Sequence, residues 1–171
     1  MGMSVTIDRA AEQDAEQILK LQYLCYQAEA ELAGDYQIDA LTQTAGELRA
    51  EMRAGLVLVA RLGTEVVGSV RGTVDADGTA SIGRLIVHPR MQRHGLGGRL
   101  LDRIEHRLAA EADAARYRLH SGQRGEGNLR LYRRLGYAPV ATEHVSRQLN
   151  VITLEKIRAQ QPLPQTLAAS A

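Results

Sequence analysis

The sequence predicts a single α/β domain. Two observations lead to this class: helical segments alternate with strand segments along most of the chain, and 171 residues with 44% hydrophobic content suit one complete core. No internal repeat and no second domain pattern is found. We expect the domain to cover residues 1–159, and residues 160–171, which lack a core pattern, to form a flexible tail.

The first half of the chain is predicted to form a strand, two helices and three further strands. A short strand lies at Val5–Ile7. Two helical faces follow, whose apolar residues lie three or four positions apart. They are Ile18, Leu21, Cys25, Ala28 and Leu32 in the first, then Leu41, Ala45, Leu48 and Met52 in the second, which Gly55 closes. Residues 56–87 fit three strands, with turns at Gly63–Thr64 and Asp75–Gly78.

The second half is predicted to form two helices and three strands. The helix after residue 95 turns one apolar face inward, formed by Leu96, Leu100, Ile104 and Leu108. A strand at 117–120 follows, and then a helix from Asn128 to Leu135, which Gly136 ends in the left-handed conformation. Strands at 140–144 and 151–154 complete the domain.

Composition excludes several classes of protein. The 21 Lys and Arg residues balance 20 Asp and Glu residues, so no overall charge favours nucleic acid. A single cysteine, Cys25, excludes an internal disulfide and a multi-cysteine zinc site, and its apolar helix face indicates a core residue. The longest apolar run, 56–60, is too short for a signal or membrane helix. We expect a cytoplasmic protein without a metal or a membrane partner.

A glycine-rich turn is the first candidate for a binding site. Residues 92–98, with the sequence QRHGLGG, follow a strand and open a helix. Free N–H groups and the helix dipole attract anions there, and Arg93 and Arg99 add positive charge. Leu100 stands where a dinucleotide fingerprint needs its third glycine, and the Gly-Lys-Ser/Thr of nucleotide hydrolases is absent. The alternative is a tight turn whose glycines only permit its backbone conformation.

A second motif suggests which anion the turn binds. In the segment GNLRLYRRLGY, Asn128 and Tyr132 lie one helical turn apart, just before Leu135-Gly136-Tyr137. Together with Leu85-Ile86-Val87 and Gln92-x-x-Gly95-x-Gly97, this motif resembles the GNAT superfamily of acyl-CoA-dependent N-acyltransferases. The resemblance covers residues 4–156. Each motif is weak alone, but the two in this order, with a helix and a strand between them, are specific.

The resemblance implies a GNAT-like fold and acetyl-CoA as cosubstrate. The fold would be a mixed central sheet of about six or seven strands flanked by about four helices. The CoA pyrophosphate would lie against the turn, at Gln92, Arg93, His94, Gly95, Leu96, Gly97, Gly98 and Arg99. The pantetheine arm would lie beside Leu85, Ile86 and Val87, on a strand that carries a bulge and splays from its neighbour. A main-chain N–H near Val87 would polarise the thioester carbonyl.

The resemblance also implies an N-acetyltransferase that moves an acetyl group to a primary amine by direct attack in a ternary complex. Tyr132 would donate a proton to the leaving CoA thiolate, and its alternative role is a core tyrosine at helical spacing. Asn128 would contact the pantetheine, although many relatives carry that asparagine at the position of Gly125. Helix N-cap is the alternative role of Asn128.

The general base and the acceptor are less determined. His120 lies where some relatives carry a glutamate base, and a free imidazole has a pKa of about 6.5; Glu126, Glu143 and a water chain are the alternatives. Between Leu21 and Leu48 there are acidic residues but no Lys or Arg, so this segment would attract a cationic amine, unless it is only a solvated helix face. The amine would belong to a small molecule, a peptide or a protein, and the chain would act as a monomer or as a homodimer.

Two other functions would account for parts of the sequence. A non-catalytic acyl-CoA sensor would keep the glycine turn without the chemistry, and the presence of Tyr132 favours an enzyme. A nucleic-acid module would use the arginines between 84 and 107. However, Arg99, Arg103 and Arg107 form one helical stripe among acidic residues, without an aromatic stacking platform. We therefore expect no nucleic-acid partner.

Overall fold

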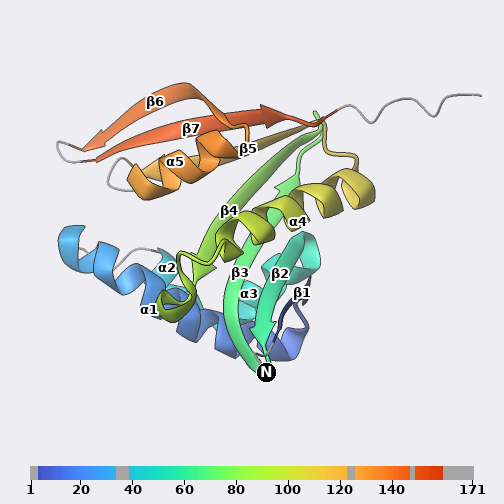
Figure 1. Cartoon of the computed structure of the whole chain (residues 1–171), viewed down its shortest axis with the longest axis vertical. Helices are drawn as coiled ribbons and strands as arrows, with labels where there is room; N and C mark the ends of the chain where they lie inside the picture. The colour runs from blue at the N-terminus through green and yellow to red at the C-terminus, as the bar shows by residue number, and fades with distance from the viewer. Residues whose placement is uncertain (1–3, 34–38, 123–125, 147–148, 160–171) are drawn as a thin grey trace, which may run out of the picture.

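A seven-stranded sheet forms the centre of the computed structural model, which describes residues 4–33, 39–122, 126–146 and 149–159 (Figure 1). The tail expected at 160–171 lies outside these residues. The strand order is β1-β2-β3-β4-β5-β7-β6, and β4–β5 is the parallel pair of an otherwise antiparallel sheet. This mixed sheet confirms the predicted fold class. The strands are β1 Val5–Arg9, β2 Leu56–Leu62, β3 Glu65–Val74, β4 Thr79–Val87, β5 Arg116–Gly122, β6 Ala138–Ser146 and β7 Leu149–Ile157.

Helices cover both faces of the sheet. The α-helices of the described residues are α1 Ala15–Ala33, α2 Asp39–Thr42, α3 Ala45–Ala54, α4 Leu96–Ala112 and α5 Glu126–Arg134, with short 3₁₀ helices at Glu12–Asp14 and Pro89–Met91. The helices α1 and α3 pack on one face, and α4 and α5 pack on the other. No helix in the described part of the chain is long and apolar enough to cross a membrane.

The core has two layers because the central strands are buried on both faces. In β2, Leu58 and Ala60 belong to the cluster under α4, whereas Val57 and Val59 belong to the cluster under α1. A strand buried on both faces reads as a continuous apolar run, which explains residues 56–60. The predicted inward face of α4 is confirmed, since all its members are buried: Leu96, Leu100, Ile104 and Leu108.

The second predicted helix is two helices. The apolar stripe from Leu41 to Met52 predicted one continuous element, but α2 ends at Thr42 and α3 begins at Ala45. A capping box separates them: the Thr44 hydroxyl accepts the Glu47 N–H at 3.1 Å, and the Glu47 carboxylate accepts the Thr44 N–H at 3.2 Å. Such a cap satisfies helix-start donors and fixes where a helix begins.

Substitution by alanine should have opposite effects on stability at two glycines, one inside α3 and one at its C-terminal end. A Cβ at Gly55 would lie 2.6 Å from Thr73 Cγ2 and 2.8 Å from the Gly72 carbonyl oxygen, and this backbone cannot move aside easily. We expect Gly55→Ala to lower the free energy of unfolding by about 1–3 kcal/mol. A Cβ at Gly46 would meet only Thr44 Oγ1, at 3.9 Å. Gly46→Ala should raise the free energy by about 0.4–1 kcal/mol. Urea unfolding of both variants measures this difference, and equal effects would contradict it.

Candidate active site

The strands β4 and β5 pair only at their beginnings and then diverge. Their register pairs are Thr79–Arg116, Ala80–Tyr117 and Ser81–Arg118, and the following residues of the two strands are not paired with each other. Figure 1 shows the divergence as a V that opens away from the start of β5, with α5 along one arm. We call the segments 82–87 of β4 and 119–122 of β5 the splay. The splay that the resemblance implied is therefore present.

A bulge in β4 changes which residues face each side of the sheet. The pairing with β3 passes from Arg71–Gly83 to Ser69–Ile86, so two residues of β4, Arg84 and Leu85, stand opposite one residue of β3. Ile82 belongs to the cluster under α4, but Ile86, four residues later, belongs to the cluster under α1. Regular alternation would place both on one face, so the bulge inverts the alternation. The implied bulge is also present.

The main chain of Val87 faces the splay. The His88 N–H donates to the Val67 carbonyl at 2.8 Å, which makes the neighbouring pair Gly68–Val87 a non-hydrogen-bonded antiparallel pair. The N–H and C=O of Val87 therefore point away from β3. The Val87 carbonyl accepts the Gln92 side-chain amide at 3.1 Å and the Cys25 thiol at 3.5 Å. The N–H of Val87, which also points away from β3, is directed toward the splay.

The glycine turn lies between the end of β4 and α4. Arg93 and Gly95 have positive φ angles of 68° and 77°, and Gly95 is the N-cap of α4. Backbone segments of this type form concave sites that bind anions through their N–H groups. Gln92, Arg93, His94 and Gly95 are exposed. The position of Gly95 requires the left-handed conformation, so this glycine serves the turn itself.

The other predicted residues of the turn have different surroundings. A Cβ at Gly97 would lie 3.6 Å from Leu131 of α5, and one at Gly98 would lie 3.8 Å from the same side chain, so the start of α4 lies close to α5. Leu96 points into the core, and only its main chain borders the turn. The Arg99 guanidinium donates to the Val5 carbonyl at 3.4 Å, on β1. The arginine is therefore directed toward the N-terminal strand.

Tyr132 is buried on the α4 side of the splay. It belongs to the core cluster that contains Leu119 of β5, and its ring packs edge-on against Tyr137, with 6.2 Å between the ring centroids. Its helix ends at Arg134 and is followed by Gly136 with φ 98°, as predicted. Asn128 lies within the first turn of α5, which begins at Glu126, so the alternative N-cap role of Asn128 is wrong. The side chains of Asn128 and Glu126 lie outside the described residues.

A polar cluster lies next to the ring pair of Tyr132 and Tyr137. The Lys156 ammonium lies 2.9 Å from Oε1 of Glu105, and the Tyr117 hydroxyl donates to the Glu105 main-chain carbonyl at 3.1 Å. Burial raises the pKa of the Glu105 carboxyl, and Lys156 opposes that shift. Burial and the neighbouring Glu105 carboxylate raise the pKa of the Tyr137 hydroxyl. Glu105 is buried although it lies beside the arginine stripe of α4, and its partner Lys156 lies 51 residues away along the chain.

His120 lies on the opposite face of the sheet from Tyr132. Tyr117 and Leu119 of β5 point into the cluster under α4, so His120, between buried neighbours, points to the other side and is exposed. Its Nδ1 lies 3.0 Å from the Thr153 hydroxyl of β7. Glu143, the other described candidate for the base, is exposed on the edge strand β6. Of the candidates that the structure describes, His120 is the one on a strand of the splay.

A polar network that the sequence did not predict lies on the same face as His120. The buried Arg71 guanidinium of β3 donates to Gln22 at 2.5 Å, Gln43 at 3.0 Å and Glu51 at 2.5 Å. Burial lowers the pKa of Arg71, and the Glu51 carboxylate opposes that shift. The Gln22 amide also donates to the Ala40 carbonyl at 2.8 Å. The network ties α1, α2 and α3 to the sheet beside the splay.

Cys25 is half-buried on α1, with its thiol toward the Val87 carbonyl. Burial raises the pKa of the Cys25 thiol to about 11. The thiol therefore stays protonated at neutral pH.

Comparison with known proteins identifies the class. The family model of the GNAT acetyltransferases matches residues 15–137, more than half of the chain. No curated protein sequence matches the chain significantly. Among solved structures, the PaiA N-acetyltransferase of Thermoplasma acidophilum in complex with coenzyme A has a TM-score of 0.74 at 18% identity, covering 91% of this chain and 100% of that one. YncA of Salmonella typhimurium, solved with acetyl-CoA, has a TM-score of 0.70 at 20% identity, covering 95% and 99%.

A third structure, the GNAT acetyltransferase of Streptococcus pneumoniae, gives a TM-score of 0.73 at 18% identity, covering 91% of this chain and 100% of that chain. The fold and the matched motifs define an acyltransferase. The chain belongs to the GNAT acetyltransferase family. It is an N-acetyltransferase, and the resemblance stated from the motifs is confirmed.

Proposed function

We propose that the protein transfers an acetyl group from acetyl-CoA to a primary amine by direct attack in a ternary complex. The observation that carries the proposal is the Val87 main chain, which faces the splay between β4 and β5. An N–H fixed at that place stabilises the oxyanion that develops when an amine attacks a thioester. Two solved structures of the same fold contain coenzyme A or acetyl-CoA, which supports the choice of cosubstrate.

The cosubstrate would extend from the glycine turn to the splay. Its diphosphate would accept hydrogen bonds from the main-chain N–H groups of residues 93–98, where the positive φ angles of Arg93 and Gly95 support an anion site. Leu85, Ile86 and Val87 would border the pantetheine arm. Gln92 would act indirectly, because its side-chain amide donates to the Val87 carbonyl and so fixes the main chain that borders the arm. Asn128, in the first turn of α5, would contact the pantetheine from the other side.

In the proposed reaction, the acid lies on one face of the sheet and the base on the other. The amine nitrogen attacks the thioester carbon, the C–N bond forms, and the C–S bond breaks with its electron pair on sulfur. Tyr132, on the α4 side, gives its proton to the thiolate, and the tyrosinate is reprotonated through solvent by the second proton that the attacking nitrogen loses. His120, on the other side, accepts the proton that the ammonium must lose. The nucleophile is therefore the free amine. Because Tyr132 and His120 lie on opposite faces of the sheet, the acid and the base lie on opposite sides of the reacting carbon.

The cosubstrate assignment is tested by thermal unfolding. Acetyl-CoA and CoA should raise the melting temperature, because a ligand that binds only the folded state stabilises it. NAD and ATP, which lack the pantetheine arm, should raise it much less. Thiol release from acetyl-CoA across a panel of amines then tests the reaction. Equal shifts with all four ligands would reject the site, and CoA binding without thiol release from any amine would favour the acyl-CoA sensor.

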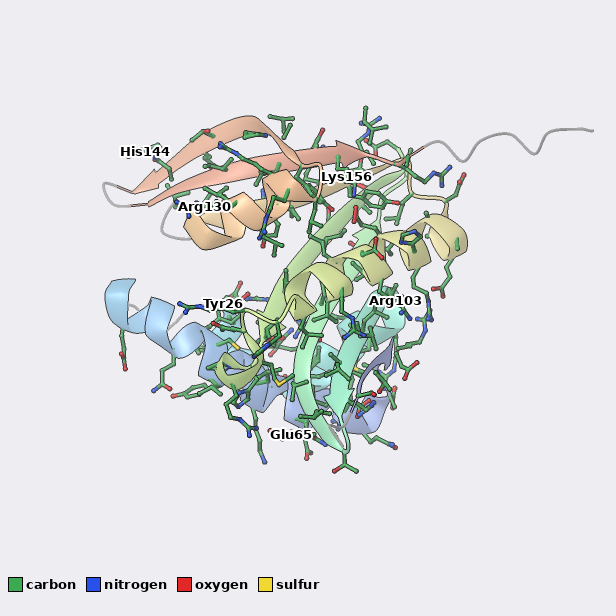
Figure 2. All side chains as sticks on the ribbon, in the orientation of Figure 1. Tyr26, Glu65, Arg103, Arg130, His144 and Lys156 are labelled. Carbon is green, nitrogen blue, oxygen red and sulfur yellow. The ribbon has the colours of Figure 1, made fainter. Side chains whose placement is uncertain are left out.

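The base assignment predicts a change in the pH dependence of the rate. In His120→Ala, the acidic limb of the profile of kcat/KM against pH should move or vanish, because the proton acceptor is lost. His144→Ala is the matched control, since His144 is exposed at the far end of β6, hydrogen-bonded to Asn150 (Figure 2). An unchanged profile in an active His120→Ala enzyme would assign the role to Glu126, Glu143 or a water chain.

A further inference from the structure

Arg84 projects from the bulge of β4 toward α1. Regular alternation would point it to the α4 side together with Ile82, but the bulge places it on the other face. Its guanidinium carbon lies 5.7 Å from the centroid of the Tyr26 ring on α1. Figure 2 shows Tyr26 on the part of α1 that lies near the end of β4. Bulges commonly re-aim a side chain at a functional site, and here the re-aimed side chain is a cation.

The backbone of Arg84 is held in a conformation that L-residues rarely adopt. Its φ angle is 51°, in the left-handed region. A non-glycine residue persists there only where the surrounding structure fixes it, which is typical of functional sites. Gly83, immediately before it, is exposed, and an added Cβ would meet no described atom within 4 Å. Open space therefore lies next to the arginine, on the face that carries His120.

The charge of Arg84 is not neutralised by any residue that the structure describes. Arg71, its neighbour on this face, pairs with Glu51, and Arg118 of β5 pairs with Glu155. For Arg84, the contact found among the described residues is the Tyr26 ring, and no carboxylate lies within the 4.0 Å of an ion pair. The ring orients the guanidinium by a cation–π contact without cancelling its charge. A half-buried cation of this kind is suited to bind an anion.

We propose that Arg84 binds the carboxylate of the acceptor, so that the substrates are small amino carboxylates. This inference rests on the proposed function, because it places the acceptor on the His120 side of the splay. The planar guanidinium would hold the carboxylate in a bidentate pair, and the amine would point along β4 toward the acetyl group at Val87. Arg84 then determines specificity: it selects acceptors by their carboxylate and takes no part in proton transfer.

The test compares amino acids with their own carboxamides. Thiol release from acetyl-CoA is measured with L-amino acids, β-alanine and 4-aminobutyrate, each beside its carboxamide, which keeps the amine and removes the charge. Wild type should prefer the acids. In Arg84→Asn, KM for the preferred acid should rise by about 10- to 100-fold, since one charge-assisted pair is lost, with kcat and the carboxamide rates little changed. Asparagine tolerates the left-handed conformation, so this variant should fold.

One control variant, a second test variant and a binding measurement define the interpretation. Arg116→Asn removes an exposed arginine at the start of β5 and should leave every KM unchanged. Gly83→Val fills the open space beside Arg84 and should also raise KM for the acids. Isothermal titration of the CoA-loaded protein with the same acids should show binding that Arg84→Asn weakens, which measures the carboxylate site without turnover.

The outcomes separate this inference from the proposed function. Thiol release that is equal for acids and carboxamides, or that Arg84→Asn lowers equally for both, would overturn the inference and leave acetyl transfer standing. Acid binding that depends on Arg84, in a protein that releases no thiol, would support the carboxylate site and reject the proposed reaction. Neither thiol release nor acid binding would overturn both.

Discussion

Tyr132→Phe is expected to lower turnover by about 100-fold while CoA affinity stays close to wild type. The substitution keeps the aromatic ring, and therefore the edge-on packing against Tyr137, but removes the proton that the thiolate would receive. The rate of thiol release at saturating acetyl-CoA measures the effect, and isothermal titration measures CoA binding. A change in CoA affinity alone would make Tyr132 a binding residue.

Tyr137→Phe is the matched control for this experiment. It also removes a hydroxyl from a buried tyrosine of the same ring pair. The raised pKa of Tyr137 makes its hydroxyl a weaker acid, and the proposed reaction does not use this hydroxyl. Turnover should stay near wild type. If both variants lost the same activity, packing of the ring pair rather than the Tyr132 proton would explain the loss.

Gly97→Val is expected to weaken CoA binding by about 100-fold or more, because a charged ligand loses several main-chain hydrogen bonds. The helical backbone at Gly97 has no positive φ, and a Cβ there would stay 3.6 Å from Leu131 and 3.9 Å from Val87. The domain should therefore fold. The remaining atoms of the valine would occupy the space over the first turn of α4, between the diphosphate and its donors.

Gly46→Val serves as the control, since Gly46 is an exposed helical glycine far from the turn in sequence. Both variants are titrated with CoA after circular dichroism has confirmed folding. Normal CoA affinity in Gly97→Val would show that the glycine serves the packing of α4 against α5 only. Gly95 is a poorer test, because its φ of 77° would strain any β-branched residue regardless of the ligand.

The elements that the sequence predicted correctly are those with strong local signals. The stripe from Leu96 to Leu108, the left-handed Gly136 and the apolar run 56–60 each follow from spacing or from one residue's conformational preference. The split between α2 and α3 also has a local signal, since Thr44 and Glu47 form the capping-box pattern. It was missed because the apolar stripe continues through Thr44 with helical spacing.

Other features depend on contacts that no local pattern contains. The family resemblance implied a bulge in this strand, but the sequence did not place it at Arg84, because the change of face appears only when Ile86 packs under α1. Glu105 has the spacing of a solvated helix residue, and its burial depends on Lys156. The motifs indicated where the cosubstrate would lie. They could not indicate the acceptor side, which is assembled from α1, β3 and the bulge.

The short parallel pairing of β4 and β5 has a consequence for how this enzyme could diversify. Beyond Ser81 and Arg118 the two strands share no ladder hydrogen bonds, so the distance between them is not fixed by pairing with each other. With the thioester in the splay, as proposed, substitutions at such positions would alter the room for an acyl chain without breaking sheet pairing, and therefore at little cost in backbone hydrogen bonding. In the proposed complex, point mutations could therefore change the length of the accepted acyl chain, while the paired end of the two strands stays the same.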